Sequence, residues 1–262
     1  MFDKNKTIFS IFAILIFAFS SFHIKNFRVD ASSDTLVSQN DVDFEYFTYY
    51  QNIFPSKNNL IIAIKSEKRI DQHLLNEIEL ISNKITKIKE VYSVFNLNKA
   101  PILFLNSTNL IDLSNNNYET ILNTNFSTED VLNEFVNSPI YKNQIINNKK
   151  NITSLIIFLK SNEKLNDLKL NKNNYINNNT YYKIKSEIDN ERNDLINEIR
   201  NILTNSNTNY EYYLGGVEMI SNDVISFVKN DILVFSLSVL IIVLIILFSI
   251  FKKIKWVMSI VI

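Results

Sequence analysis

The sequence predicts an α+β membrane protein in which transmembrane helices flank an outer domain of ferredoxin-like β-α-β repeats. Two apolar runs, at residues 8–22 and 232–251, have the composition of membrane helices. Between them, the apolar pattern twice follows the order strand, helix, strand. The chain thus divides into an N-terminal transmembrane helix at 1–24, an outer domain at 25–231, a second transmembrane helix at 232–251, and a cytoplasmic turn with the start of a third helix at 252–262.

The run at 232–251 is the strongest signal of a membrane segment. It contains three serines and no ionisable residue. As a helix it would span roughly 30 Å, which is the thickness of the hydrocarbon core. A buried helix of a soluble protein normally carries a polar stripe, and this run has none.

The residues after this run indicate the orientation of the chain. Lys252, Lys253 and Lys255 follow at once, and basic clusters at a helix end mark the cytoplasmic side. Trp256 fits an interfacial position, and residues 257–262 are apolar again. We expect a third transmembrane helix to begin there, and the sequence to be a piece of a longer protein.

The N-terminal run has two interpretations. Lys4 and Lys6 precede the apolar residues 8–22, which places the N-terminus in the cytoplasm. An uncleaved helix is favoured, because the apolar residues continue to Phe22 and Ile24. A cleaved signal peptide is the alternative, with Ala18-Phe19-Ser20 as a weak cleavage site. Both interpretations place residues 25–231 outside, so the predicted topology is in, out, in.

Composition excludes several classes of site. The chain has no cysteine, and therefore no disulfide, thiolate nucleophile or cysteine-based metal site. Only two histidines, His23 and His73, and two glycines, Gly215 and Gly216, are present, too few for a multi-histidine metal site or a glycine-rich phosphate loop. The formal charge is zero, with 27 basic and 27 acidic side chains, so no charge field points to nucleic acid. We predict no cofactor, no metal and no enzymatic activity.

The first strand-helix-strand pattern covers residues 59–97. Residues 59–65 form a short apolar run typical of a buried strand, and Asp71 can cap the helix that comes next. Residues 91–97 fit a second strand. One face of the helix is apolar, with residues at three- and four-residue steps: Leu74, Ile78, Ile81, Ile85 and Ile88.

The same order returns later, with strands at 152–160 and 210–214 and a helix at 180–203. Two such units predict a ferredoxin-like sandwich, with the helices on one face of a sheet. In the segment between them a helix is expected at 129–136, with Ser127 and Thr128 as candidate caps and Pro139 limiting its end. The apolar face of the helix at 180–203 comprises Ile184, Ile188, Leu195, Ile199 and Ile202.

The connection to the second membrane segment is predicted to be rigid. Gly215-Gly216 ends the last strand, and a helix from about Glu218 runs into the apolar run without a breaker. Movement of the outer domain would then be transmitted to the membrane helix. The residues expected to pack on the sheet are Met219, Ile220, Val224, Ile225 and Val228.

Two groups of residues have both a functional and a simpler interpretation. Asp223 and Asp231 could be relay carboxylates at the outer mouth of a membrane domain; more simply, they are solvated carboxylates with Lys229 nearby. The second group is aromatic and could line a path for a hydrophobic molecule or, more simply, pack a helix onto a sheet. It comprises Phe44, Tyr46, Phe47, Tyr49 and Tyr50.

The order of parts resembles a transporter superfamily. A short N-terminal helix is followed by Asp30-Ala31-Ser32-Ser33-Asp34-Thr35-Leu36, and Tyr212-Tyr213-Leu214-Gly215-Gly216 precedes the second membrane helix and its basic turn. In this arrangement the chain resembles the first part of a transporter of the resistance-nodulation-division (RND) superfamily. Within it, the resemblance is to the branch of exporters that includes the MMPL lipid transporters, the hopanoid transporters and Patched-like proteins with a sterol-sensing domain.

The resemblance implies a proton-motive-force-driven exporter of lipids or other hydrophobic molecules, multi-pass in the bacterial inner membrane, with porter-like periplasmic domains. Its partners would be the lipid bilayer, a hydrophobic or lipid-like substrate, and a homo-oligomer or an accessory periplasmic protein. The coupling carboxylates would lie beyond Ile262, because residues 232–251 contain no ionisable residue. No catalytic, cofactor-binding or metal-binding residue is assigned.

Two other functions fit parts of the pattern. A membrane receptor would hold a ligand-sensing domain between two helices, but it would continue into a long charged cytoplasmic helix, whereas this chain turns apolar again at Val257. A membrane-anchored outer-surface enzyme would have to rely on carboxylate chemistry, because histidine is scarce and cysteine is absent.

Overall fold

The computed structural model describes residues 42–53, 58–162, 164, 167–168 and 179–252. The N-terminal helix expected at 1–24, the stretch Asp30–Leu36 and the third helix expected from 252–262 lie outside the described residues, apart from Lys252. The described chain forms two compact units, one within Val37–Asn222 and one that starts at Asp223.

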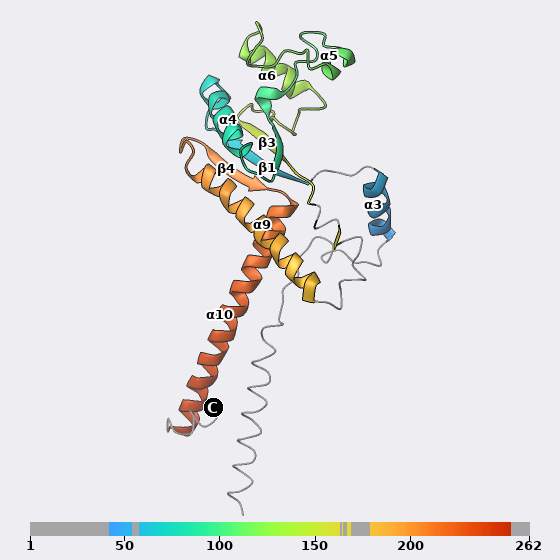
Figure 1. Ribbon diagram of the computed structural model, residues 1–262. Helices are drawn as coiled ribbons and strands as arrows, with labels where there is room; N and C mark the ends of the chain where they lie inside the picture. The colour runs from blue at the N-terminus through green and yellow to red at the C-terminus, as the bar shows by residue number, and fades with distance from the viewer. Residues whose placement is uncertain (1–41, 54–57, 163, 165–166, 169–178, 253–262) are drawn as a thin grey trace, which may run out of the picture. The chain divides into compact units, whose positions relative to one another are not determined.

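A four-stranded antiparallel sheet is the centre of the first unit (Figure 1). The strands are β1 (Asn59–Lys65), β2 (Val91–Phe95), β3 (Ile152–Leu159) and β4 (Glu211–Gly215), in the order β2-β3-β1-β4. Helix α4 (Gln72–Ile85) connects β1 to β2, and α9 (Asn179–Thr204) lies between β3 and β4. Each β-α-β unit therefore has a strand of the other unit between its own two strands. The predicted mixture of helices with a sheet of two β-α-β units is confirmed.

The strands bury one face of the sheet under α4 and α9, which contact each other. In β1 the side chains of Leu60, Ile62 and Ile64 are fully buried, whereas the alternate residues are at least partly exposed. This alternation is the period-two pattern of a strand with one covered face. Across the sheet, Ile62 lies opposite Leu155 on β3 and Leu214 on β4.

Helix α4 follows its predicted pattern closely. Its N-cap is Asp71, whose carboxylate accepts a hydrogen bond of 2.9 Å from the backbone N–H of Leu74. Ile88 lies beyond the end of the helix but is still buried. The helix residues predicted for the apolar face are all fully buried: Leu74, Ile78, Ile81 and Ile85.

Strand β2 ends two residues earlier than predicted, because Asn96 caps a 3-10 turn at Leu97–Lys99. The Asn96 side chain accepts from the backbone N–H of Lys99 at 3.2 Å and donates to the Ser82 hydroxyl at 2.6 Å. These two bonds satisfy a fully buried amide. The turn therefore replaces the last strand residues.

The segment between the two β-α-β units contains α5 (Leu110–Ser114) and α6 (Thr128–Asn137). The prediction of α6 is confirmed, with Ser127 as its N-cap, whose hydroxyl accepts from the Asp130 N–H at 3.1 Å. Thr128, the other candidate cap, is the first residue of the helix. The apolar residues of α6 are buried in the same core as the sheet.

Helix α10 (Val217–Phe251) begins directly after β4 and includes the whole run predicted to cross the membrane. Within the part of the chain that the structure describes, it is the one helix long and apolar enough to span a membrane. As expected, the helix continues from the end of the sheet into the apolar run without an interruption. Met219 packs against the core, whereas Ile220, also predicted to pack there, is exposed.

Gly216 is the residue on which the β4–α10 junction depends. Its φ of +128° lies in a region that residues with a side chain rarely adopt. A Cβ atom at this position would lie 2.9 Å from the Asn59 carbonyl oxygen and 3.2 Å from the Leu60 Cα. At Gly215 the nearest atom to a Cβ would be the Ile61 carbonyl oxygen, at 3.9 Å. The sequence places both glycines here, but only the second one requires glycine.

We expect Gly216→Ala to destabilise the protein by about 1–3 kcal/mol, because backbone strain of this kind costs that much. Gly215→Ala is the matched control and should leave stability nearly unchanged. Urea unfolding of the detergent-solubilised protein, followed by circular dichroism, measures both. Equal losses of stability in the two variants would show that the strain assigned to Gly216 is wrong.

Candidate functional site

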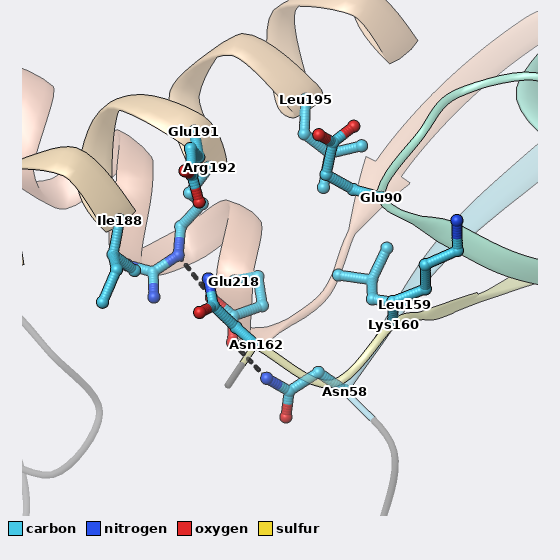
Figure 2. Close-up of a pocket in the computed structure, with 10 residues that line it drawn as sticks. All are labelled: Asn58, Glu90, Leu159, Lys160, Asn162, Ile188, Glu191, Arg192, Leu195 and Glu218. Atoms are coloured by element: carbon cyan, nitrogen blue, oxygen red, sulfur yellow. Dashed lines mark hydrogen bonds and ion pairs between the residues drawn. The ribbon is translucent and has the colours of Figure 1, made fainter. Parts of the chain in front are cut away.

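A partly buried ion pair connects α9 to the first turn of α10 (Figure 2). The Arg192 Nε lies 2.5 Å from Glu218 Oε2, with the two side chains only 15% and 17% exposed. Asn58 donates to the other carboxylate oxygen of Glu218 at 2.8 Å, and Asp189 lies 3.4 Å from the Arg192 guanidinium. We refer to Asn58, Asp189, Arg192 and Glu218 as the α10 anchor.

Local structure brings these residues together from three parts of the chain. Asn58 precedes β1, Arg192 lies in the middle of α9, and Glu218 is the second residue of α10. A carboxylate in the first turn of a helix is stabilised by the positive end of the helix dipole. The close contact of Gly216 with the start of β1 brings Glu218 within reach of Asn58.

The cavity beside the anchor is small, about 80 Å³. Small-molecule sites usually measure roughly 300–1,000 Å³, so this cavity cannot enclose a lipid or a cofactor. The arrangement can hold the end of α10 in place, but it cannot bind a large ligand. The residues that line the cavity are Asn58, Glu90, Leu159, Lys160, Asn162, Ile188, Glu191, Arg192, Leu195 and Glu218.

A second polar arrangement lies on α6. The Glu134 carboxylate is mostly buried and accepts hydrogen bonds from three successive backbone N–H groups, those of Leu103, Phe104 and Leu105, at 2.6, 3.1 and 2.8 Å. A shallow hollow of about 450 Å³ lies beside them, lined also by Asp130, Asn133 and Asn137. Because these three N–H groups are satisfied by the carboxylate, the turn at 103–105 is held in place and the Phe104 side chain stays exposed.

The described residues that were singled out in the sequence lie on separate elements. Asp223 and Asp231 lie on α10, eight residues apart. Among the aromatic residues of α3 (Val42–Ile53), Tyr46, Tyr49 and Tyr50 are exposed. His73 is exposed at the start of α4. His23 lies outside the described residues.

Sequence reasoning missed the residues of both polar arrangements, although a signal was present. Arg192 lies four residues after Ile188 and three before Leu195, so it occupies a position on the apolar face of α9. Glu134 lies three residues after Val131 and directly before Phe135, and both of these side chains are buried. A charged residue at core spacing needs a partner, and here each has one.

Metal binding finds no support among the residues that the structure describes, because no group of three or more His, Asp or Glu side chains is arranged to hold an ion. The ionic contacts at the rim of the anchor cavity are protein pairs. Lys164 lies 3.0 Å from Glu191 and 3.7 Å from Glu187. The hydrogen bond to Glu191 raises the pKa of Lys164 above its ordinary value.

A double-mutant cycle on Arg192→Gln and Glu218→Gln should give a coupling energy between about 0.5 and 3 kcal/mol, the range for contacting partners in one polar network. The exposed pair Lys65–Glu211, whose side chains are 44% and 53% exposed, is the matched control. Exposed pairs contribute about 0–1 kcal/mol. Urea unfolding of the four variants of each cycle measures the coupling. If the coupling energy of Arg192–Glu218 is no larger than that of the control pair, the anchor is contradicted.

The pH dependence of stability should include the Glu129–Lys150 pair. The hydrogen bond from the Lys150 ammonium holds the pKa of Glu129 below its ordinary value of 4.5, and Arg69 adds to this effect. A carboxylate with a lowered pKa in the folded state stabilises the protein above pH 4.5, and this contribution disappears as the pH falls through the folded-state pKa.

Glu129→Gln should therefore be less stable than the natural chain at neutral pH, with a difference that shrinks below pH 4.5. Unfolding midpoints measured across this range test it. Glu198→Gln, at an exposed carboxylate of α9, serves as a control for the removal of any one charge. A difference for Glu129→Gln that stays constant down to low pH would exclude the assigned linkage.

Comparison with known proteins adds no family to this description. No model of a protein family matches the chain, and no curated protein matches it significantly. The functional proposal is therefore derived from the fold, the anchor and the apolar helix.

Proposed function

We propose that the chain is the first part of an RND-type exporter that moves lipids or other hydrophobic molecules, with residues 25–231 as its periplasmic porter-like domain. One observation carries the proposal. The last strand of a split β-α-β domain turns at Gly216 directly into α10, which continues without interruption into an uncharged run of membrane length. A domain that rearranges during transport needs such a direct connection to the membrane.

The proposed topology has its N-terminus in the cytoplasm and several membrane passages. Lys252 ends the described part of the chain and begins the basic cluster that predicts the cytoplasmic side. The apolar run after Asp231 has no ionisable residue. Proton coupling would therefore be the task of carboxylates in other membrane helices, and the contribution of α10 would be mechanical.

The shape of the described cavities supports a substrate that moves along surfaces, because the larger one, beside Glu134, is a shallow and open hollow. The cavity at the α10 anchor measures about 80 Å³, too small for a lipid tail. Exposed apolar side chains are present instead beside the shallow hollow and on α5, at Phe104, Leu105, Leu110 and Ile111. A hydrophobic substrate would contact such surfaces in an assembled transporter.

A receptor is the second candidate, because a continuous helix between a ligand-sensing domain and the membrane also serves signalling. The two functions differ in the segment that comes after Lys252. A transporter returns to the membrane, as the apolar residues from Val257 predict, whereas a receptor continues into a cytoplasmic signalling module.

The topology can be tested directly, because the chain has no cysteine of its own. Leu80→Cys, at an exposed position on α4, should react with a membrane-impermeant maleimide in intact spheroplasts. Lys252→Cys should react only after the membrane is permeabilised. Labelling of both variants in permeabilised cells is the control. Reaction of the Lys252→Cys thiol in intact spheroplasts would overturn the proposed orientation.

Transport is tested by deleting the complete gene and comparing the lipids of the inner and outer membranes by mass spectrometry. A lipid class should accumulate in the inner membrane, a protonophore should reproduce the effect, and the gene supplied in trans should reverse it. Unchanged lipid distributions together with an altered signalling output would favour the receptor and contradict the exporter.

A further inference from the structure

Helix α3 carries an apolar stripe that is exposed to solvent. The residues of this stripe, at positions 42, 46, 49, 50 and 53, follow one another at steps of four, three, one and three residues and therefore share one side of the helix. The rings of Tyr49 and Tyr50 meet edge to face, with centroids 5.5 Å apart. We call this set the tyrosine stripe: Val42, Tyr46, Tyr49, Tyr50 and Ile53, each between 49% and 65% exposed.

The sheet presents a second apolar surface on the face turned away from α4 and α9. Phe95, Ile156 and Ile61 lie opposite one another across three neighbouring strands, so their side chains point to the same side. Ile61 is 40% exposed, and Tyr213 on β4 is 55% exposed. We call this surface the open face: Ile61, Ala63, Phe95, Ile156, Phe158 and Tyr213.

We propose that the tyrosine stripe docks on the open face, so that the chain itself supplies the helix that covers the second side of its sheet. The two surfaces match in length. The 12 residues of α3 extend about 18 Å as a helix, and the seven residues of β1 extend about 23 Å as a strand. Docking would give the sheet helices on both faces.

The short connection favours docking within one chain over a contact between two copies. Only residues 54–58 separate the end of α3 from the first residue of β1. β1 is an inner strand of the sheet, so α3 is attached at the end of an inner strand rather than beside an edge strand. Such a short connection makes the effective concentration of α3 at the sheet of its own chain millimolar or higher. The α3 helix of a second copy would have to reach a higher local concentration to compete for the same surface.

Polar groups beside the open face are satisfied without the help of α3. Lys65 lies 3.1 Å from the Glu211 carboxylate, which also accepts a hydrogen bond from the Tyr213 hydroxyl. These bonds lower the pKa of Glu211, first through Tyr213 and then through Lys65. An apolar helix could therefore cover the neighbouring face without leaving a buried charge unpaired. This inference does not depend on the transport function.

The test uses double-cysteine variants of the full chain in native membranes, which is practical because the chain has no cysteine. Tyr49→Cys with Ile156→Cys should form an intramolecular cross-link with a short bifunctional maleimide, identified by mass spectrometry of the joined peptides. Tyr49→Cys with Leu80→Cys, an exposed position on α4, is the matched control and should not cross-link. Failure of the first pair, equal yields for both pairs, or cross-links only between chains would each overturn the proposal.

A second measurement does not require exact cross-linking geometry. The rate at which Ile61→Cys reacts with a maleimide should rise roughly tenfold or more when Tyr46→Asp and Tyr49→Asp are added, since a tenfold change corresponds to about 1.4 kcal/mol and burying a carboxylate against apolar residues costs more. Leu80→Cys in the same two backgrounds is the control and should react at the same rate. Unchanged reactivity of Ile61→Cys would show that α3 does not cover the sheet.

Discussion

The hydrogen-bonded pairing of β1 with a strand on each of its two sides is the constraint on which the rest of the domain depends. β1 is antiparallel to β3 on one side and to β4 on the other. A slip of one residue in either ladder would turn Leu60, Ile62 and Ile64 away from the helices. Burying an aliphatic side chain of this size contributes about 1.5–3 kcal/mol, and a whole domain is stable by only about 5–15 kcal/mol. Three such side chains together contribute about 4.5–9 kcal/mol, which is comparable with the stability of the whole domain, so burial strongly favours the observed register.

The same strand fixes where α10 begins. The carbonyl of Asn59 and the backbone of Leu60 leave no room for a side chain at position 216, and Asn58 donates to Glu218 two residues later. Arg192 reaches the same carboxylate from α9. Ion pairs of this kind add little net stability, because desolvation offsets the attraction. The anchor therefore serves mainly to define the geometry of the junction, while the apolar core provides the stability.

The sequence predicted elements whose burial is local and periodic. β1 was expected at residues 59–65 and is found there, and the α4 cap at Asp71 was correct, because both depend on residues within one turn or one strand. Strand β2 was expected to reach Leu97, since apolar alternation cannot reveal that Asn96 bonds to Ser82, fourteen residues away. The two predicted β-α-β units imply that both helices pack on one face of the sheet, and α4 and α9 do so.

The polar contacts were not predicted, because their partners are distant in sequence. Asn58 and Glu218 are 160 residues apart, and Glu134 bonds to N–H groups about 30 residues before it. A single sequence shows that Arg192 and Glu134 occupy apolar positions, but it does not show which group compensates each charge. The segment at 98–150 was predicted least well for the same reason, since its core contacts are made with other elements and only α6 has a clear period of its own.

The composition of α10 limits what this helix can contribute. It contains no proline or glycine between Val217 and Phe251, and sharp kinks in helices almost always occur at such residues or at π-bulges. After Asp231 it has no ionisable side chain, so it can carry no proton. A continuous helix that is uncharged after Asp231, and whose first turn is fixed by the close contact at Gly216 and by an ion pair, is suited to transmitting a displacement. The α10 anchor, with Gly216, is the point at which this helix is joined to the sheet, because Arg192 and Asn58 both hold Glu218.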